Sequence, residues 1–266
     1  MMFFFVFLSG MSIEMSARQR IYFIYSHGLF HNYTQAFTYM KKYCHPEEAV
    51  AHEKSIIHSL CTLFDYADAT HAFFRIKPRS SALGQKAEVE QLKKVYDTVC
   101  AQAEKEGDDF LIILFGVSRG AAVIVNFVGT HQPSHVGALV LESPYDSIAT
   151  VIDHIRYTFG YAVSHDMIQK IFELFFGTYT RTGIAPIDVV DRIDSAIPVL
   201  IVCSQEDARV PATSSFALYK KLRTHGHKKS HLLVLNHGSH GHLYTGPDSY
   251  SYISGVNKFY KQYNAL

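Results

Sequence analysis

Residues 110–122 have the sequence FLIILFGVSRGAA, and this stretch decides how the rest of the chain is interpreted. The apolar residues 111–115 predict a buried strand, and the residues after Gly120 favour a helix. Between them, Gly116-Val117-Ser118-Arg119-Gly120 has the G-x-S-x-G spacing of a nucleophile elbow in its required strand–turn–helix context. A serine on so sharp a turn lifts its hydroxyl above the sheet, and the flanking glycines leave room for the strained backbone. The alternative is an ordinary strand-to-helix turn that happens to contain a serine.

The composition describes one globular domain. The chain has 266 residues, enough for one α/β domain with a sizeable core and too few for two. Hydrophobic residues make up 48% and charged residues 18%, which excludes a disordered chain. The formal net charge is only +1, so neither nucleic acid nor an acidic membrane surface is an expected partner. The four cysteines lie far apart without a C-x-x-C pair, so no disulfide framework is expected.

Residues 1–17 are predicted to be a leader or a disordered N-terminus, and residues 18–266 a single domain. The apolar run from Phe3 to Leu8 is too short to span a bilayer, so no stable membrane insertion is expected. No basic segment precedes this run and no small-x-small cleavage site follows it. We therefore favour a cytoplasmic protein, with a secretory leader as the alternative.

Continuously apolar runs alternate with helical patterns, which predicts a mostly parallel sheet of about six strands with helices on both faces. The expected strands cover residues 21–25, 111–115, 136–141, 197–203 and 232–235, with one more at either 59–66 or 71–76. The expected helices cover residues 33–43, 85–106, the segment after the elbow, 213–224 and 250–263. In the helix at 85–106, apolar residues recur at helical spacing and the Glu and Lys residues are expected on the opposite face.

Residues 147–183 interrupt this alternation, because they are rich in aromatic residues and contain no obvious strand. They contain one amphipathic helical stripe, formed by Ile168, Ile171, Phe172 and Phe175 and widened by Met167, Leu174 and Phe176. The segment is longer than a simple crossover needs, so it is either a small helical cap or a helix packed on the sheet with its loops.

A nucleophilic serine needs a base, and the base needs an acid to orient it. In an elbow fold these residues follow in the order Ser, acid, His, each just past the end of a strand. Glu206 and Asp207 follow the strand at 197–203, and His237, His240 and His242 follow the last strand. The three histidines also have a metal-like H-x-x-H-x-H spacing, but no acidic ligand lies beside them, so no metal is predicted.

Several of these segments together resemble the α/β-hydrolase superfamily, and most closely its compact lysophospholipase-like and serine-aminopeptidase-like members. The resemblance spans roughly residues 20–265. It is carried by His27-Gly28, the elbow at 116–120, Leu141-Glu142-Ser143-Pro144-Tyr145, the strand at 197–201, Asp207-Ala208-Arg209-Val210-Pro211 and His240-Gly241-His242. These motifs are specific for the superfamily and not for a substrate.

The resemblance implies that Asp207 is the acid, with Glu206 as runner-up, and that His240 is the base, ahead of His242 and then His237. Ser204 stands where the family usually has glycine, which affects the expected turn geometry and not the assignment.

The turn at the elbow aims the amide of Arg119 at a developing oxyanion. The resemblance places the second oxyanion donor at Leu29, with Phe30 as alternative. His27 is expected to be a structural turn residue, and Glu142 is given no catalytic role.

These expectations describe a serine hydrolase that cleaves carboxylic esters, including lipid-like esters or thioesters, through an acyl-enzyme and without a cofactor. The expected partner is a small-molecule ester, with an acyl lipid as one form of it. Two alternatives remain open, a serine peptidase or aminopeptidase of the same fold and a catalytically idle α/β-hydrolase scaffold. The oligomeric state and the physiological substrate are not predicted.

Overall fold

A computed structural model describes residues 20–29, 39, 60–63, 82–107, 109–158 and 160–263. They contain a six-stranded sheet whose neighbouring strands are all parallel, in the order β2-β1-β3-β4-β5-β6. The strands are β1 Arg20–Ser26, β2 Leu60–Leu63, β3 Phe110–Val117, β4 Val136–Glu142, β5 Val199–Ser204 and β6 Ser230–Leu235. The elbow strand β3 lies inside the sheet between β1 and β4, so its continuous apolar run is covered on both faces. The predicted mostly parallel sheet is confirmed.

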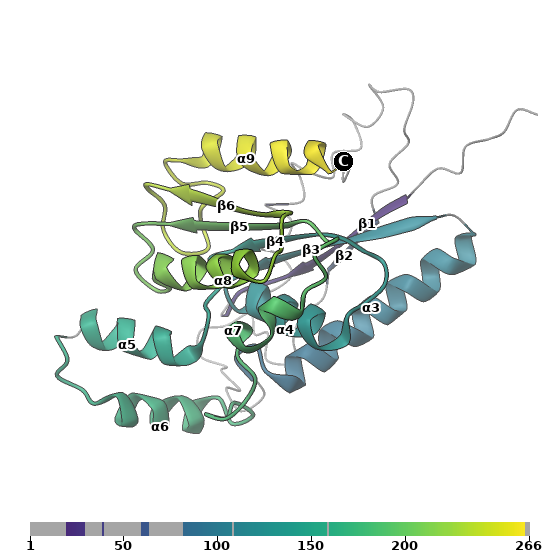
Figure 1. Cartoon of the computed structure of the whole chain (residues 1–266). Coiled ribbons are helices and arrows are strands. Elements are labelled where there is room, and N and C mark those ends of the chain that lie inside the picture. The colour runs from purple at the N-terminus through teal and green to yellow at the C-terminus, as the bar shows by residue number, and fades with distance from the viewer. Residues whose placement is uncertain are drawn as a thin grey trace, which may run out of the picture.

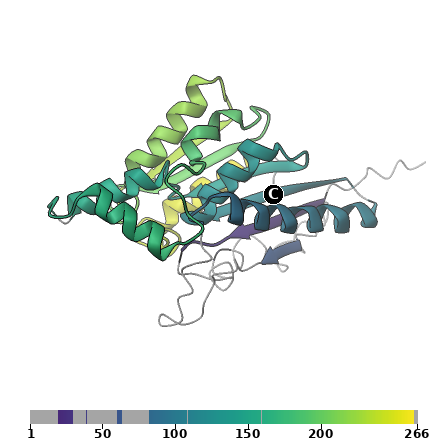
Figure 2. The same ribbon diagram turned by 90° about the horizontal axis from the view of Figure 1, so that it is seen from below.

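Helices cover both faces of the sheet (Figures 1 and 2). The described helices are α3 Lys86–Glu106, α4 Arg119–His131, α5 Ile148–Thr158, α6 His165–Phe175, α7 Pro186–Val189, η2 Val190–Arg192, α8 Ala212–Thr224 and α9 Ser249–Gln262. Helices α3, α4 and α8 share one apolar core with the sheet, and α9 closes a second core on the opposite face. This sandwich of three layers is the arrangement expected for a buried parallel sheet.

Most of the elements predicted from the sequence are present within a few residues of their expected bounds. The strand expected at either 59–66 or 71–76 is β2, in the first of these runs. Residues 71–76 lie outside the described part of the chain, as does the helix expected at 33–43 except for Tyr39. The short helical segments α7 and η2 were not predicted, because Pro186 begins a run too short to show a helical period.

Helix α3 corrects the expectation that all its acidic residues face solvent. Val89, Leu92 and Val99 are buried as expected, and Gly107 ends the helix in the left-handed conformation with φ 74°. Glu88, however, is completely buried. It lies four residues before Leu92 and therefore on the same side of the helix as the apolar stripe.

Helices α5 and α6 form a pair that projects from the body of the molecule (Figures 1 and 2). We call residues 147–183 the cap segment, although whether it is a true cap stays a prediction. Ser164 caps α6, and its hydroxyl accepts a hydrogen bond from the amide of Met167 at 3.2 Å. The inner side of the pair contributes Ile152 and Ile168 to an apolar cluster, with Phe172 packed against it.

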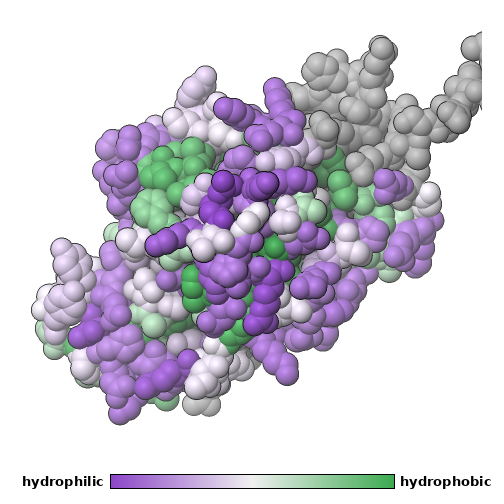
Figure 3. Space-filling view, in the orientation of Figure 1, coloured by the Kyte–Doolittle hydropathy of each residue, from purple (hydrophilic) through white to green (hydrophobic). Residues whose placement is uncertain are grey.

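The outer side of α6 does not match the expected stripe. Met167, Ile171, Leu174 and Phe175 are exposed, Leu174 to 70% of its surface. Only a narrow line of α6 therefore packs on the domain, and Met167 and Leu174, which widen the stripe in the sequence, do not take part in this packing. On the face shown in Figure 3, hydrophilic side chains cover most of the surface and hydrophobic ones form separate patches. Among the described residues, no helix combines the length and apolar character needed to cross a membrane.

Hydrogen bonds fasten both ends of the cap segment. Near its start, the Tyr145 hydroxyl donates to the Leu83 carbonyl at 2.8 Å. Near its end, the side-chain amide of Gln85 donates to the carbonyl of Thr180 at 2.7 Å and accepts from its amide at 2.9 Å. Both attachments are made to the segment that leads into α3, so this segment fixes where the cap begins and ends.

Candidate active site

Ser118 stands at the sharp turn between β3 and α4. Its φ is positive, with φ 53° and ψ −115°, a combination that residues other than glycine rarely adopt, and its amide donates to the carbonyl of Glu142 at 2.8 Å. A side chain at Gly116 would come within 2.6 Å of the amide nitrogen of Ala121, and one at Gly120 within 1.9 Å of the carbonyl oxygen of Ser26. Glycine is therefore required at both flanking positions, and the strained serine conformation is held by its surroundings.

A chain of two hydrogen bonds links Ser118, His240 and Asp207. The distance from His240 Nε2 to Ser118 Oγ is 2.8 Å, and that from His240 Nδ1 to Asp207 Oδ2 is 2.7 Å. The side chains of His240 and Asp207 are only 11% and 1% exposed, and Ser118 is buried as well. Three residues from loops after β3, β5 and β6 thus meet at the carboxyl edge of the sheet, within the reach that proton transfer requires.

The Asp207 carboxylate is held ionised by its neighbours. Burial alone would raise its pKa, but the hydrogen bond and charge of His240 and the amides of Val210 and Arg209 bring the pKa below its usual value. Both amides lie 2.9 Å from Oδ1, so the oxygen that does not face His240 is also satisfied. Ser204, in the position where glycine was expected, accepts from the Glu206 amide at 3.2 Å and so supports the same turn.

The runner-up residues lie elsewhere. Glu206 points away from Ser118 and pairs with His237 at 2.8 Å on the surface, where both side chains are more than half exposed. The pair raises the pKa of His237. His242 is exposed on the loop after Gly241. In the described part of the chain, no group of three or more His, Cys, Asp or Glu side chains is placed to hold a metal ion.

The side chain of Arg119 has a place that the sequence did not suggest. It is almost completely buried and forms an ion pair with Glu88 at 3.0 Å. Its other terminal nitrogen lies 3.5 Å from the Gly28 carbonyl and 3.5 Å from Nδ1 of His27. Glu88 in turn accepts from the amides of Ala82 and Gly84. The ion pair therefore connects the elbow to the loop after β1. The sequence contains one signal of it, because Glu88 is a charged residue on the apolar side of α3.

The amides of Arg119 and Leu29 are the predicted oxyanion donors. Arg119 is the first residue of α4, where an amide has no acceptor within the helix. Leu29 directly follows His27-Gly28 at the carboxyl end of β1, the strand next to β3, and packs against the apolar cluster of the cap segment. Phe30, the alternative donor, lies outside the described residues.

Glu142, which was expected to have no catalytic role, is a second carboxyl group near the site. It is completely buried at the end of β4, where the hydroxyls of Tyr39 and Tyr252 donate to its two oxygens. Burial raises its pKa to about 7, although both hydrogen bonds and the nearby His240 act to lower it and only Asp207 adds to the rise. The two tyrosines that donate to Glu142 are more than 100 positions away in the sequence, so no local pattern could have indicated this environment.

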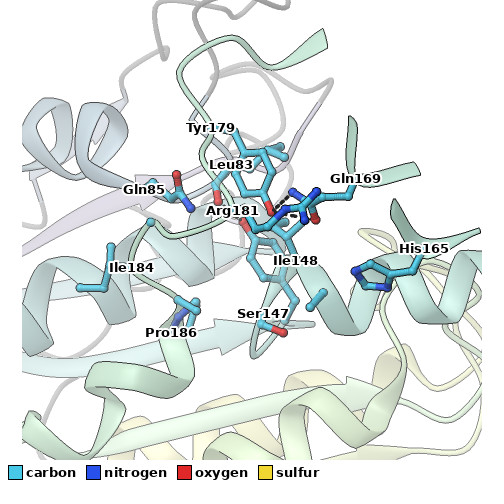
Figure 4. Close-up of a pocket in the computed structure, with 14 residues that line it drawn as sticks. Leu83, Gln85, Ser147, Ile148, His165, Gln169, Tyr179, Arg181, Ile184 and Pro186 are labelled. Atoms are coloured by element: carbon cyan, nitrogen blue, oxygen red, sulfur yellow. Dashed lines mark hydrogen bonds between the residues drawn. The ribbon is translucent and has the colours of Figure 1, made fainter. Parts of the chain in front are cut away.

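A cavity of about 140 Å³ lies between the cap segment and the residues that lead into α3 (Figure 4). Its lining includes Leu83, Gln85, Gln169 and Tyr179, and none of Ser118, Asp207 or His240. Gln169 donates to the Tyr179 hydroxyl at 3.0 Å, and Gln85 holds Thr180, so these polar groups stabilise the cap segment itself. We therefore treat this cavity as part of the cap's attachment.

Comparison with known proteins places this geometry in context. The sequence profile of the prolyl oligopeptidase family matches residues 82–265, more than half of the chain. The uncharacterized protein YqkD of Bacillus subtilis is 26% identical over 180 residues, which are 66% of this chain and 55% of that protein. The chain thus spans about half the length of this curated relative.

Solved structures with the same fold are esterases, lipases and peptidases. Esterase Pf2001 of Pyrococcus furiosus superposes with a TM-score of 0.63 at 16% identity, covering 93% of this chain and 83% of that one. Acylaminoacyl peptidase of Pyrococcus horikoshii has a TM-score of 0.62 at 15% identity, covering 92% and 37%. Monoacylglycerol lipase of Paleococcus ferrophilus has a TM-score of 0.57 at 14% identity, covering 90% and 93%. The predicted α/β-hydrolase fold is confirmed.

Proposed function

The chain belongs to the prolyl oligopeptidase family, and from that premise we propose that it is a serine hydrolase acting through an acyl-enzyme. The single observation that carries the proposal is the unbroken chain of hydrogen bonds from Ser118 through His240 to Asp207. An idle scaffold has no chemical reason to retain these three groups in contact.

In the proposed mechanism, His240 Nε2 removes the hydroxyl proton as Ser118 Oγ attacks the substrate carbonyl. Asp207 keeps Nδ1 protonated, which fixes the tautomer and stabilises the imidazolium. The amides of Arg119 and Leu29 donate to the oxyanion. The imidazolium then returns its proton to the leaving group, which departs as the acyl–serine ester forms. Water repeats the cycle with His240 as base and releases the acid.

We propose carboxylic esters with apolar acyl groups as the substrate class. Support comes from the apolar cluster that joins Ala122, one turn beyond Ser118, to Val210 of the acid loop and to the inner side of α5 and α6. Leu29, at the predicted oxyanion site, packs against this cluster. An acyl group bound beside Ser118 would meet apolar surface, and an alkoxide leaving group needs less protonation than an amine.

Peptide hydrolysis is the second candidate. The observation that favours it is the match to a family described by its oligopeptidase members. A peptidase would use the same serine, so the two candidates differ only in the leaving group and in what binds beside it.

The test joins active-site labelling to a substrate panel. A fluorophosphonate probe should label the wild-type protein and not Ser118→Ala, while His242→Ala, a change to an exposed histidine, should label normally. Turnover of p-nitrophenyl esters with little turnover of aminoacyl p-nitroanilides supports the ester proposal, and the reverse preference supports a peptidase. A folded protein that neither binds the probe nor turns over any of these substrates contradicts the proposed function.

A further inference from the structure

The buried carboxyl of Glu142 belongs to the strand next to the one that leads into the proposed catalytic serine. Glu142 is the last residue of β4 and pairs in register with Val117, the residue before Ser118. Its carbonyl accepts the hydrogen bond from the Ser118 amide at 2.8 Å. The backbone of Glu142 therefore supports the turn that carries Ser118, and both residues lie at the carboxyl edge of the sheet.

Aromatic residues enclose this carboxyl and connect it to the histidine loop. Oε1 accepts from the Tyr39 hydroxyl at 2.9 Å, and Oε2 accepts from the Tyr252 hydroxyl at 2.8 Å. The same Tyr39 hydroxyl lies 3.4 Å from the carbonyl oxygen of Gly241, the residue after His240. The Tyr39 ring is packed among other aromatic rings, those of Tyr25, Phe115, Tyr244 and Tyr252. These contacts hold its hydroxyl between the two acceptors.

A count of protons shows that Tyr39 cannot serve both acceptors fully. A tyrosine hydroxyl has one proton, and a carboxylate has none. When Glu142 is ionised, the charged oxygen is the stronger acceptor, so Tyr39 donates to Oε1 and the Gly241 carbonyl loses its donor. When Glu142 is protonated, its own proton can bond the Tyr39 oxygen, and the Tyr39 proton is then directed to Gly241.

Both states of Glu142 are accessible near neutral pH. The titratable groups that face it are Tyr25 from β1, Tyr39, Tyr252 from α9, and His240 and Asp207 from the loops beyond β6 and β5. With its pKa at about 7, the carboxyl titrates in the range where a histidine base becomes active. A positive charge on His240 in turn lowers the pKa of Glu142, so the two groups interact.

We propose that Glu142 is a positioning residue for His240, which acts through Tyr39 by determining whether the Gly241 carbonyl is hydrogen-bonded. The inference rests on the proposed function, since it gives His240 the role of the base. In the protonated state the chain Glu142–Tyr39–Gly241 holds the histidine loop against the end of β4. In the ionised state the loop is released from Tyr39, and His240 gains a second negative neighbour besides Asp207.

Three variants separate these effects. Glu142→Gln is isosteric and cannot ionise, and its amide can donate to Tyr39 as the protonated acid does. Tyr39→Phe removes the link to Gly241. Tyr252→Phe is the matched control, because it removes a hydrogen bond to the same carboxyl, keeps the aromatic ring, and leaves the contact between Tyr39 and Gly241 in place. Each is assayed for kcat and kcat/KM against pH on one p-nitrophenyl ester, with fluorophosphonate labelling as the measure of an intact site.

In the wild type, the plot of kcat against pH should show two ionisations, that of the histidine base and a second one near pH 7, the pKa of Glu142. Glu142→Gln should lose the second ionisation, and its histidine limb should move to lower pH because a negative neighbour is gone. Tyr252→Phe should keep the second ionisation and move it to higher pH, because the ionised carboxyl loses a donor. At pH values below the pKa of Glu142, Tyr39→Phe should lower kcat by about tenfold with KM little changed, as expected for a misplaced base. Above that pKa the variant and the wild type should have similar kcat, because Tyr39 no longer donates to Gly241 in either protein.

The inference is wrong if the second ionisation persists in Glu142→Gln, or if Tyr39→Phe has the kcat profile of the wild type. In either case, labelling of Ser118 by the fluorophosphonate would still support the proposed function. If wild-type protein does not label at all, the proposed function fails, and NMR titration of the His240 ring still decides the coupling. A His240 pKa that is the same in wild type and Glu142→Gln contradicts the inference, and a lower pKa in the variant supports it.

Discussion

Helices α4 and α6 are similar in length and apolar content, yet they are packed in opposite ways. In α4 every residue from Arg119 to Gly129 is buried. In α6 only Ile168 and Gln169 are buried, and Met167 and Leu174 are 56% and 70% exposed. Helix α4 lies against the sheet and contacts α3 and α7, whereas the main helical partner of α6 is α5.

This difference separates the closely packed part of the molecule, which holds the proposed nucleophile, from the loosely packed cap segment. The proposed nucleophile stands at the beginning of the most enclosed helix, where close packing fixes its strained backbone. The cap segment has few buried contacts, and segments of that kind open at low free-energy cost. We expect stability and activity to follow the same division.

The largest effect is expected at the elbow. Ser118→Ala should lower kcat/KM for a p-nitrophenyl ester by about 10⁴-fold or more, because the members of a catalytic triad act as a unit. The urea midpoint should hardly change, since a single small hydroxyl is lost. His240→Ala should be similarly inactive and His242→Ala should remain active. An inactive His242→Ala with an active His240→Ala would show that the base has been misassigned.

Breaking the buried ion pair behind the elbow should come next. Glu88→Gln leaves the Arg119 guanidinium buried without its counter-charge, so the free energy of unfolding should fall by about 3–5 kcal/mol. The matched control is Asp97→Asn on the same helix, which removes an exposed pair with Lys93 and should cost at most about 1 kcal/mol. Equal urea midpoints for the two variants would contradict the structural role given to Arg119.

A direct comparison of the two helices uses one large-to-small change in each. Ile124→Ala in α4 should lower the free energy of unfolding by about 2–5 kcal/mol, since the side chain is completely buried. Leu174→Ala in α6 should change it by no more than about 0.5 kcal/mol, because that side chain is mostly in solvent. A comparable loss in both variants would mean that the outer side of α6 is covered in solution, and the contrast between the helices would no longer hold.

The role of the cap segment in substrate choice should produce a smaller, graded effect. If its inner side contacts the acyl group, kcat/KM for p-nitrophenyl esters from acetate to decanoate should rise about fourfold with each added methylene until the pocket is full. This factor corresponds to the burial of one methylene, about 0.8 kcal/mol. In Phe172→Ser, which alters the apolar cluster beside the site, the rise should flatten. If acetate is the best substrate of both proteins, the cap segment does not contact the acyl group and is an ordinary part of the core.

The smallest effect concerns acid stability. The pKa of Asp207 is lowered in the folded protein, so its ionised form stabilises the fold above the unfolded value of about 3.9, and that stabilisation is lost as the pH falls through the folded value. Asp207→Asn should therefore flatten the acid limb of stability against pH. Asp153 on α5 has a pKa lowered by His165 and Arg156, but it is exposed, so the effect of Asp153→Asn should vanish in high salt. Salt sensitivity of the Asp207 effect would argue that its site is open to solvent.

The sequence predicted the sheet, and it predicted His240, which contacts Ser118, and Asp207, which contacts His240, because each of these residues follows the end of an apolar run, a local signal. The environment of Glu142 has no such signal, because its enclosure depends on Tyr39 and Tyr252 at more than 100 positions' distance. The exposure of Leu174 was missed for a related reason. Periodicity shows that a helix has an apolar side, but only the fold shows how much of that side finds a partner.

The two attachments of the cap segment limit how it can move. Residues 147–183 are fastened near one end through Tyr145 and near the other through Gln85. Both attachments reach one short stretch, Leu83 to Gln85, so they restrain the segment at a single place and act together as one hinge. We therefore expect α5 and α6 to rotate together about this hinge when the segment moves, and not to separate from each other.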